Sequence, residues 1–302
     1  MKVAQFFEHM LVKELFHHEI KIPSKRRDSL NLSELTKLAK FKTKKGILLQ
    51  GDTFEWMGKI PDKSVNMILA DLPYGTTQNK WDEVLPFNKL WSEYERIIID
   101  NGAIVLTGKQ PFTSMLVMSN PKIHKYNIVW RKNLKTGNLN ARKMPMGAYE
   151  DIVIFYKYPP TYNPQKIPRT FQVKSGNKKN SKTENYGKQR EEYIDRQSDW
   201  LMPDDVIDYE DAYPLDALEL ENEMLYIKCL HNSSGKLHPT QKPVELFEWL
   251  IKTYTNEGDI VLDNTAGVLT TGVAAEINNR KWICIEKEEK YCVAGMTRFE
   301  NM

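Results

Sequence analysis

The chain has 302 residues, of which 41% are hydrophobic, and its formal net charge is only +3. This length suffices for one large domain or for a domain with an insertion. The three cysteines show no CxxC spacing, which argues against a disulfide framework and a structural zinc site, and no apolar run is long enough for a membrane span. The N terminus carries early charges and no long apolar segment, so we expect no signal peptide and a soluble, cytoplasmic protein.

Residues 1–45 form a candidate N-terminal helical extension. Apolar residues such as Phe6, Met10 and Leu11 recur at helical spacing ahead of Pro23. The segment holds eleven Lys or Arg residues against five Asp or Glu residues. Two interpretations stay open: a solvated appendage packed on the main domain, or a basic surface that contacts nucleic acid or another subunit.

Residues 46–160 alternate between short apolar runs and longer amphipathic segments. We expect strands at residues 47–49, 65–70, 103–107, 126–130 and 151–156, and helices at residues 86–99 and 111–118. Buried strands separated by helices predict an α/β domain, in which a mostly parallel sheet carries helices on both faces.

The alternation fails in residues 161–235, which we interpret as an insertion. Residues 166–190 hold eight basic side chains and one acidic one, whereas residues 199–223 hold ten acids and no Lys or Arg. The basic half suits a phosphate backbone, although a solvated loop remains the alternative.

The sheet pattern resumes in residues 236–302. Strands are expected at residues 259–263 and 282–286, with a helix at 270–277 between them and a last helix after them. Counting both sides of the insertion predicts about seven strands in one sheet.

Four acids follow expected strands: Asp52, Asp71, Asp263 and Glu286. Ligands of open α/β sheets bind at the carboxyl ends of the strands, so these acids are candidate ligand contacts, although each alone could be a helix cap or turn residue. The spacing from Asp263 to Glu286 fits a nucleoside cofactor, whose ribose hydroxyls the second acid would bind. The intervening turn lacks GxGxxG, and the acid-rich site favours a ligand with positive charge.

The stretch Asp71-Leu72-Pro73-Tyr74 carries a second chemistry. An ionised Asp71 only accepts hydrogen bonds, and the carbonyl of Leu72 or Pro73 adds a second acceptor. Two acceptors fit an exocyclic amino group and would aim its nitrogen lone pair outward, while Tyr74 offers a face for a flat base. A strand end in an ordinary turn is the alternative.

At these residues the sequence resembles the amino-directed DNA methyltransferases. Residues 71–74 are similar to the catalytic DPPY motif, with Leu72 in place of the first proline. His238-Pro239-Thr240-Gln241-Lys242-Pro243 resembles the segment before the cofactor-binding strand, and Val261-Leu262-Asp263 with Gly267 and Thr270 resembles the cofactor loop. The catalytic motif precedes the cofactor loop, which is the order of the circularly permuted β class.

The resemblance implies a Rossmann-like, seven-stranded, mostly parallel sheet with one antiparallel strand, S-adenosylmethionine as cofactor, no metal, and a target base flipped from duplex DNA. It makes residues 46–160 the catalytic half, 161–235 the target-recognition insertion and 236–302 the cofactor-binding half. Its catalytic residues are Asp71, Pro73 and Tyr74. Its cofactor-binding residues are Asp52, Asp71, Thr240, Lys242, Asp263, Gly267, Thr270 and Glu286. Residues 148–151 resemble the wall of the base pocket.

Leu269 departs from the family pattern, because a glycine is expected there. A positive φ at this position would strain a leucine by about 1–2 kcal/mol, and a clash with the methionine part of the cofactor would cost more. The main prediction is methylation of adenine N6. Cytosine-N4 methylation, an inactive DNA-binding protein of the same fold and a small-molecule methyltransferase are the alternatives. A homodimer, and a cognate nuclease of a restriction-modification system, stay open.

Overall fold

The computed structural model describes residues 30–77, 79, 82–168, 200–201, 203–207, 237, 241–300 and 302. The helix expected near the N terminus, Thr240 and most of the insertion at 161–235 lie outside the described residues. Within the described part, no helix is long and apolar enough to cross a membrane.

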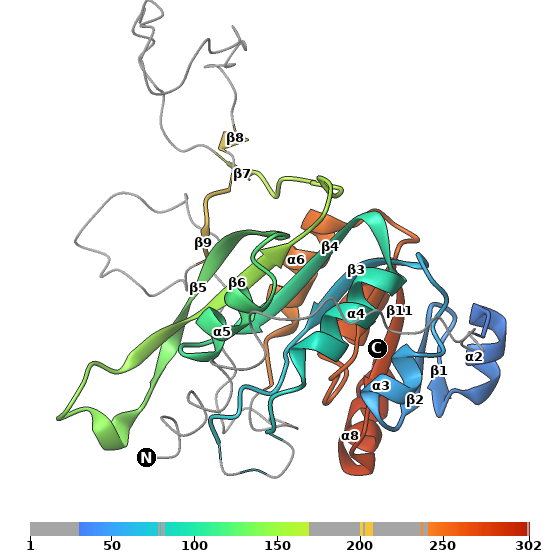
Figure 1. Cartoon of the computed structure of the whole chain (residues 1–302), viewed down its shortest axis with the longest axis horizontal. Helices are drawn as coiled ribbons and strands as arrows, with labels where there is room; N and C mark the ends of the chain where they lie inside the picture. Colours follow the sequence, from blue (N-terminus) through green and yellow to red (C-terminus); the bar gives the residue numbers. More distant parts are fainter. Residues whose placement is uncertain are drawn as a thin grey trace, which may run out of the picture.

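One sheet of nine strands organises the described part of the chain, with strand order β1-β2-β11-β10-β3-β4-β6-β5-β9 (Figure 1). A separate ribbon pairs β7 with β8. The strands are β1 Phe41–Lys42, β2 Gly46–Gln50, β3 Val65–Ala70, β4 Ile98–Gly108, β5 His124–Thr136, β6 Gly147–Phe155, β7 Ile167–Pro168, β8 Trp200–Leu201, β9 Val206–Ile207, β10 Ile260–Asp263 and β11 Lys281–Glu286.

The sheet is mostly parallel, as expected, but the count of seven strands is too low by two. The additional strands β1 and β9 are edge strands of two residues each, too short for any hydrophobic period. The prediction of a single antiparallel strand is also wrong, because β1 runs antiparallel to β2 and β6 runs antiparallel to both β4 and β5. The other neighbouring pairs of the sheet are parallel.

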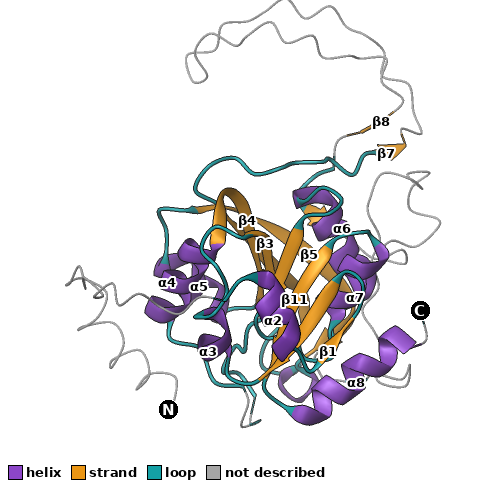
Figure 2. Cartoon of the chain, turned by 90° about the vertical axis from the view of Figure 1, so that its right-hand side faces the viewer, coloured by secondary structure: helices purple, strands orange, loops and turns teal. Residues whose placement is uncertain are grey.

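Helices cover both faces of the sheet, which confirms the predicted layers. The helices are α2 Leu32–Leu38, α3 Thr53–Met57, α4 Phe87–Ile97, α5 Phe112–Ser119, η1 Asn138–Asn140, α6 Val244–Tyr254, α7 Thr270–Ile277 and α8 Glu289–Glu300. Residues of α2, α3, α4 and α5 pack in one core cluster, and residues of α6, α7 and α8 pack in the other. Figure 2 shows these two groups of helices on opposite sides of the strands.

The helix expected at residues 86–99 ends two residues early. In α4, Leu90, Tyr94 and Ile97 are buried at helical spacing, but Ile98 already begins β4. β-Branched isoleucines favour the extended backbone, and the chain passes from helix to strand without a loop. A continuous apolar run hides such a boundary from the sequence.

Candidate active site

The four predicted acids meet at one edge of the sheet. Asp52 and Asp71 follow β2 and β3, Asp263 ends β10 and Glu286 ends β11. These four strands are neighbours in the order β2-β11-β10-β3 and all run parallel, so their carboxyl ends lie side by side. The topology therefore makes this edge the candidate active site.

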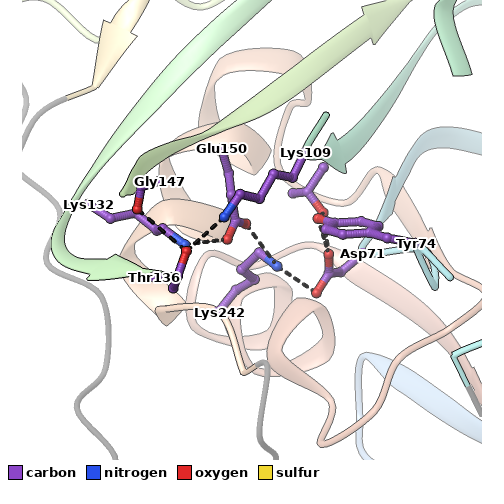
Figure 3. A network of polar contacts seen from close by, with 9 residues as sticks. Asp71, Tyr74, Lys109, Lys132, Thr136, Gly147, Glu150 and Lys242 are labelled. Carbon is purple, nitrogen blue, oxygen red and sulfur yellow. Dashed lines mark hydrogen bonds and ion pairs between the residues drawn. The ribbon is translucent and has the colours of Figure 1, made fainter. Parts of the chain in front are cut away.

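Asp71 is part of a hydrogen-bond network, at the end next to Tyr74 (Figure 3). Its Oδ1 accepts from the Tyr74 hydroxyl at 2.8 Å and from the Thr107 hydroxyl, while Lys242 Nζ donates to Oδ2 at 2.7 Å. The ring of Phe112 stacks on Tyr74 with a centroid distance of 4.9 Å. Burial and the Asp71 carboxylate raise the pKa of Tyr74 well above its usual value, so the hydroxyl stays a donor. Two of the three predicted catalytic residues are thus in direct contact.

Lys242 joins Asp71 to a second buried ion pair. Its side chain is only 7% exposed, and Nζ lies 3.2 Å from Glu150 Oε2. Lys132 Nζ donates to Glu150 Oε1 at 2.6 Å. Alternating charges of Lys132, Glu150, Lys242 and Asp71 therefore form a continuous row (Figure 3).

The pKa shifts show that Lys242 and Glu150 stay charged. Burial alone would lower the pKa of Lys242, but the Asp71 and Glu150 carboxylates raise it well above its usual value. Burial alone would raise the pKa of Glu150, but Lys242 and Lys132 hold it at about 2. Lys242 is a predicted cofactor contact, and in this structure its ammonium group lies between two carboxylates beside Tyr74.

Asp263 is engaged inside the loop that follows β10. Its Oδ1 accepts from the Thr265 N–H at 3.0 Å, and its Oδ2 accepts from the Thr271 hydroxyl. Asp263 is only 2% exposed. Burial raises the pKa of Asp263 to about 7, and the nearby carboxylates add to the rise. These contacts fix the loop, so the geometry makes Asp263 a loop-positioning residue.

Glu286 and Asp52 also bind backbone N–H groups. Glu286 accepts from Gly267 N–H at 2.8 Å and from Glu288 N–H at 2.7 Å, and burial raises its pKa. Gly267 has a φ of 50°, which favours glycine. Asp52 caps α3, since its Oδ1 accepts from the first N–H groups of that helix. The cap interpretation thus holds for Asp52, and its Oδ2 takes no part in the cap.

Leu269 adopts the left-handed conformation, with φ 61° and ψ 34°, in which a leucine is strained. Its side chain is fully buried and packs on α8, where a Cβ built on Gly295 would lie 2.4 Å from Leu269 Cγ. The Leu269 side chain therefore makes a contact within the core. The hydroxyl of Thr270, a predicted cofactor contact, accepts from Arg298 of α8 at 3.0 Å.

Two residues of the network were missed by the sequence reasoning, Thr107 and Lys132. Thr107 follows Leu106, which pairs with Ala70 in the register of β3 and β4, so Thr107 is the neighbour of Asp71 across the strands. The strand-end rule could have found it, had it been applied to hydroxyl groups as well as acids. Lys132 lies inside a strand, where no motif marked it.

Comparison with known proteins defines the class. A family model described as DNA methylase, for N6 and N4 methyltransferases, matches residues 65–296, and the chain belongs to this family. DNA adenine methyltransferase YhdJ of Escherichia coli (strain K12) is 29% identical over 266 residues, which cover 84% of this chain and 82% of the relative. Type II methyltransferase M2.MboI of Moraxella bovis is 25% identical over 280 residues, 84% of this chain and 88% of the relative.

Solved structures share the fold. The crystal structure of the M1.HpyAVI-SAM complex has a TM-score of 0.54 and 22% identity, and the match covers 84% of this chain and 99% of that chain. The cytosine-N4-specific PvuII DNA methyltransferase has a TM-score of 0.58 and 17% identity, with coverage of 85% and 87%. The predicted α/β methyltransferase fold is confirmed.

Proposed function

We propose that this protein is a DNA methyltransferase of the circularly permuted β class, which transfers a methyl group from S-adenosylmethionine to adenine N6 in duplex DNA. The observation that carries the proposal is the Asp71 carboxylate at the sheet edge, in contact with the hydroxyl of Tyr74. Membership of the DNA methylase family and the adenine methyltransferase named among the relatives support it.

On the target side, the chain binds and orients the base. Swinging adenine out of the duplex costs a few kcal/mol. Phe112 covers one face of Tyr74, so the base stacks on the other face, which contributes about 1–3 kcal/mol. Asp71 and the Leu72 or Pro73 carbonyl hold the N6 amino group, which directs its lone pair away from them. Positioning of this kind supplies much of the acceleration in such reactions.

On the cofactor side, the residues fit a cation. Burial raises the pKa values of Asp263 and Glu286, and the neighbouring carboxylates add to the rise for Asp263, so a positive ligand would relieve the repulsion. S-Adenosylmethionine supplies an electrophilic methyl group on a positively charged sulfur. We assign Glu286 to the ribose hydroxyls, Asp52 to the adenine end, and Gly267 to close approach of the loop backbone; Thr240 retains its proposed contact at the methionine end.

A hairpin between β5 and β6 offers a described surface for DNA. Figure 1 shows it reaching away from the body of the sheet, with η1 at its tip. Lys135, Arg142 and Lys143 are exposed along it, and Leu139 at the tip is 99% exposed. Basic side chains on a protruding arm suit the phosphate backbone. We propose the hairpin as a DNA contact in addition to the contact predicted for residues 161–235.

Adenine is favoured over cytosine by the motif and by the relatives. The fold alone does not separate the two bases, since a cytosine-N4-specific enzyme shares it. The motif begins with aspartate, whereas cytosine-directed members of the family more often begin it with serine. The inactive alternative depended on a clash at Leu269, and the packing of that side chain against Gly295 removes its main support.

Expression in a host that lacks adenine methylation tests the proposal. We expect N6-methyladenine at one recognition sequence, mapped by sequencing, and its complete loss in Asp71→Ala. Asp100→Ala, which removes an acid whose side chain is 66% exposed at a surface ion pair, should leave the methylation intact. Methylation that persists in Asp71→Ala, or modification at cytosine N4, would overturn the assignment. An absence of heat on titrating S-adenosylmethionine into the wild type would favour the non-catalytic alternative.

A further inference from the structure

Both carboxylate oxygens of Asp71 are engaged in this structure. Tyr74 and Thr107 share Oδ1, and the Lys242 ammonium group occupies Oδ2 at 2.7 Å. If Asp71 holds the target amino group, as the proposed function requires, that neutral group must compete with a full positive charge. A carboxylate binds an ammonium group more strongly than a neutral N–H donor. For the base to bind Asp71, the Lys242 ammonium group must therefore move from Oδ2 to another acceptor.

Glu150 provides such a place. Its Oε1 is held by Lys132 at 2.6 Å, whereas its Oε2 is buried and makes no hydrogen bond of good geometry within the described part of the chain. Lys242 Nζ lies only 3.2 Å from this oxygen, close enough for attraction between the charges. A buried acceptor with unused capacity costs free energy, so an arrangement that completes it is favoured.

We propose that Glu150 is a positioning residue, which accepts the Lys242 ammonium group when the target amino group comes to Asp71 Oδ2. In the absence of DNA, Lys242 takes the place of the amino group and keeps the partly buried Asp71 paired. In the complex, Lys242 shifts to Glu150 Oε2, and Asp71 accepts from the base. The row of two lysines and two carboxylates stays neutral in both arrangements, so neither leaves a buried charge alone.

Lys132 makes this exchange directional. It holds Glu150 by the oxygen that Lys242 does not approach, so the second oxygen remains aimed at Lys242 (Figure 3). The contact crosses from β5 to β6, where Arg131 pairs with Tyr149 and Trp130 with Glu150 in the strand register. The strands therefore fix the position of the acceptor before any base arrives.

Glu150→Gln tests the proposal, with Glu245→Gln on the exposed surface of α6 as its matched control. The duplex contains the recognition sequence mapped for the wild type. Without the Glu150 charge, Lys242 stays on Asp71. We expect the single-turnover methylation rate to fall roughly tenfold or more, while the dissociation constant for S-adenosylmethionine, measured by calorimetry, stays within about twofold. With 2-aminopurine at the target position, the fluorescence increase that reports base flipping should also shrink.

The double variant Glu150→Gln/Lys242→Met separates this role from a merely structural one. It removes one charge of each sign and frees Asp71, so it should methylate faster than Glu150→Gln alone. A Glu150→Gln protein as active as the wild type, or a double variant no faster than the single one, would overturn the exchange. Absence of methylation by the wild type would instead overturn the proposed function itself. Circular dichroism melting of each variant checks that a lost rate is not lost folding.

Discussion

The two halves of the sheet edge hold their acids in opposite ways. In the target half, Asp71 and Glu150 face the ammonium groups of Lys242 and Lys132, and the pKa of Glu150 is held at about 2. In the cofactor half, Asp263 accepts only from a backbone N–H and a hydroxyl, and burial raises its pKa to about 7. Glu150 and Asp263, two carboxyl groups near the same edge of the sheet, thus have pKa shifts of opposite direction.

The difference in pKa follows from whether each half supplies positively charged partners for its acids. The target half carries its own counter-charges, and a neutral base enters without changing their number. In the cofactor half, the hydrogen bonds to Asp263 and Glu286 come from uncharged donors, so these buried acids gain from a positively charged ligand. We infer that the charge of the cofactor completes one half, while the base completes hydrogen bonds in the other.

Removal of Lys242 should produce the largest loss of stability, because the target half depends on buried charge pairing. Lys242→Met leaves Glu150 paired with Lys132 and leaves Asp71 without a cation. We expect a loss of about 3–5 kcal/mol in the free energy of unfolding. Urea denaturation measures it. Lys252→Met is the control, since its pair with Glu248 is longer, at 3.4 Å, and its side chain is 43% exposed. Equal losses of stability in Lys242→Met and Lys252→Met would contradict the claim that buried charge pairing stabilises the target half.

Asp263→Asn should show the opposite charge preference in the cofactor half. The folded pKa of Asp263 lies near 7 and above the unfolded value, so folding is penalised increasingly as pH rises from about 4 to 7 and fully above that. Asparagine carries no charge and can still accept from Thr265 and donate to the Thr271 hydroxyl. We expect the variant to gain about 2–3 kcal/mol over the wild type at pH 8.

The gain should almost vanish near pH 4, where the wild-type carboxyl is protonated in both states. Chemical denaturation of the protein without cofactor, at pH 4.5, 6 and 8, measures the pH dependence. Asp259→Asn, at a half-buried position in the preceding turn, serves as control. A variant less stable than the wild type at pH 8 would mean that the Asp263 charge is stabilised by the loop.

The sequence predicted Asp52, Asp71, Asp263 and Glu286 as strand-end acids because each ends or follows an apolar run that is visible in one dimension. The charge pairing was not predictable in this way. Glu150 and Lys242 lie far apart in the chain, and only the pairing of β4 with β6 and the path of the segment before α6 bring them together. The edge strands β1 and β9 escaped notice because two residues carry no period.

Leu269 shows the same limit at a single residue. The sequence left open whether this position needs a positive φ, and the structure has a φ of 61° there. The direction of the Leu269 side chain depends on Gly295 of α8. The sequence of the loop does not predict that this residue of α8 faces Leu269. Packing between distant segments therefore sets what the Leu269 side chain contacts, and its contact with Gly295 offsets the backbone strain at this residue.

Gly295→Ala tests this packing and has the smallest expected effect. The added methyl group would meet Leu269 Cγ at 2.4 Å and Cδ1 at 2.8 Å, so α8 must shift, at a cost of about 1–2 kcal/mol in the free energy of unfolding. Leu269→Ala alone should cost at least as much, because it leaves a cavity in a fully buried site. In the double variant the new methyl group fills part of that cavity, so its loss of stability should be smaller than the sum of the losses in the two single variants. Strict additivity in urea denaturation would show that Leu269 and Gly295 do not support each other, and the cofactor loop would then have to be held by the contacts of Arg298 with Val268 and Thr270 instead.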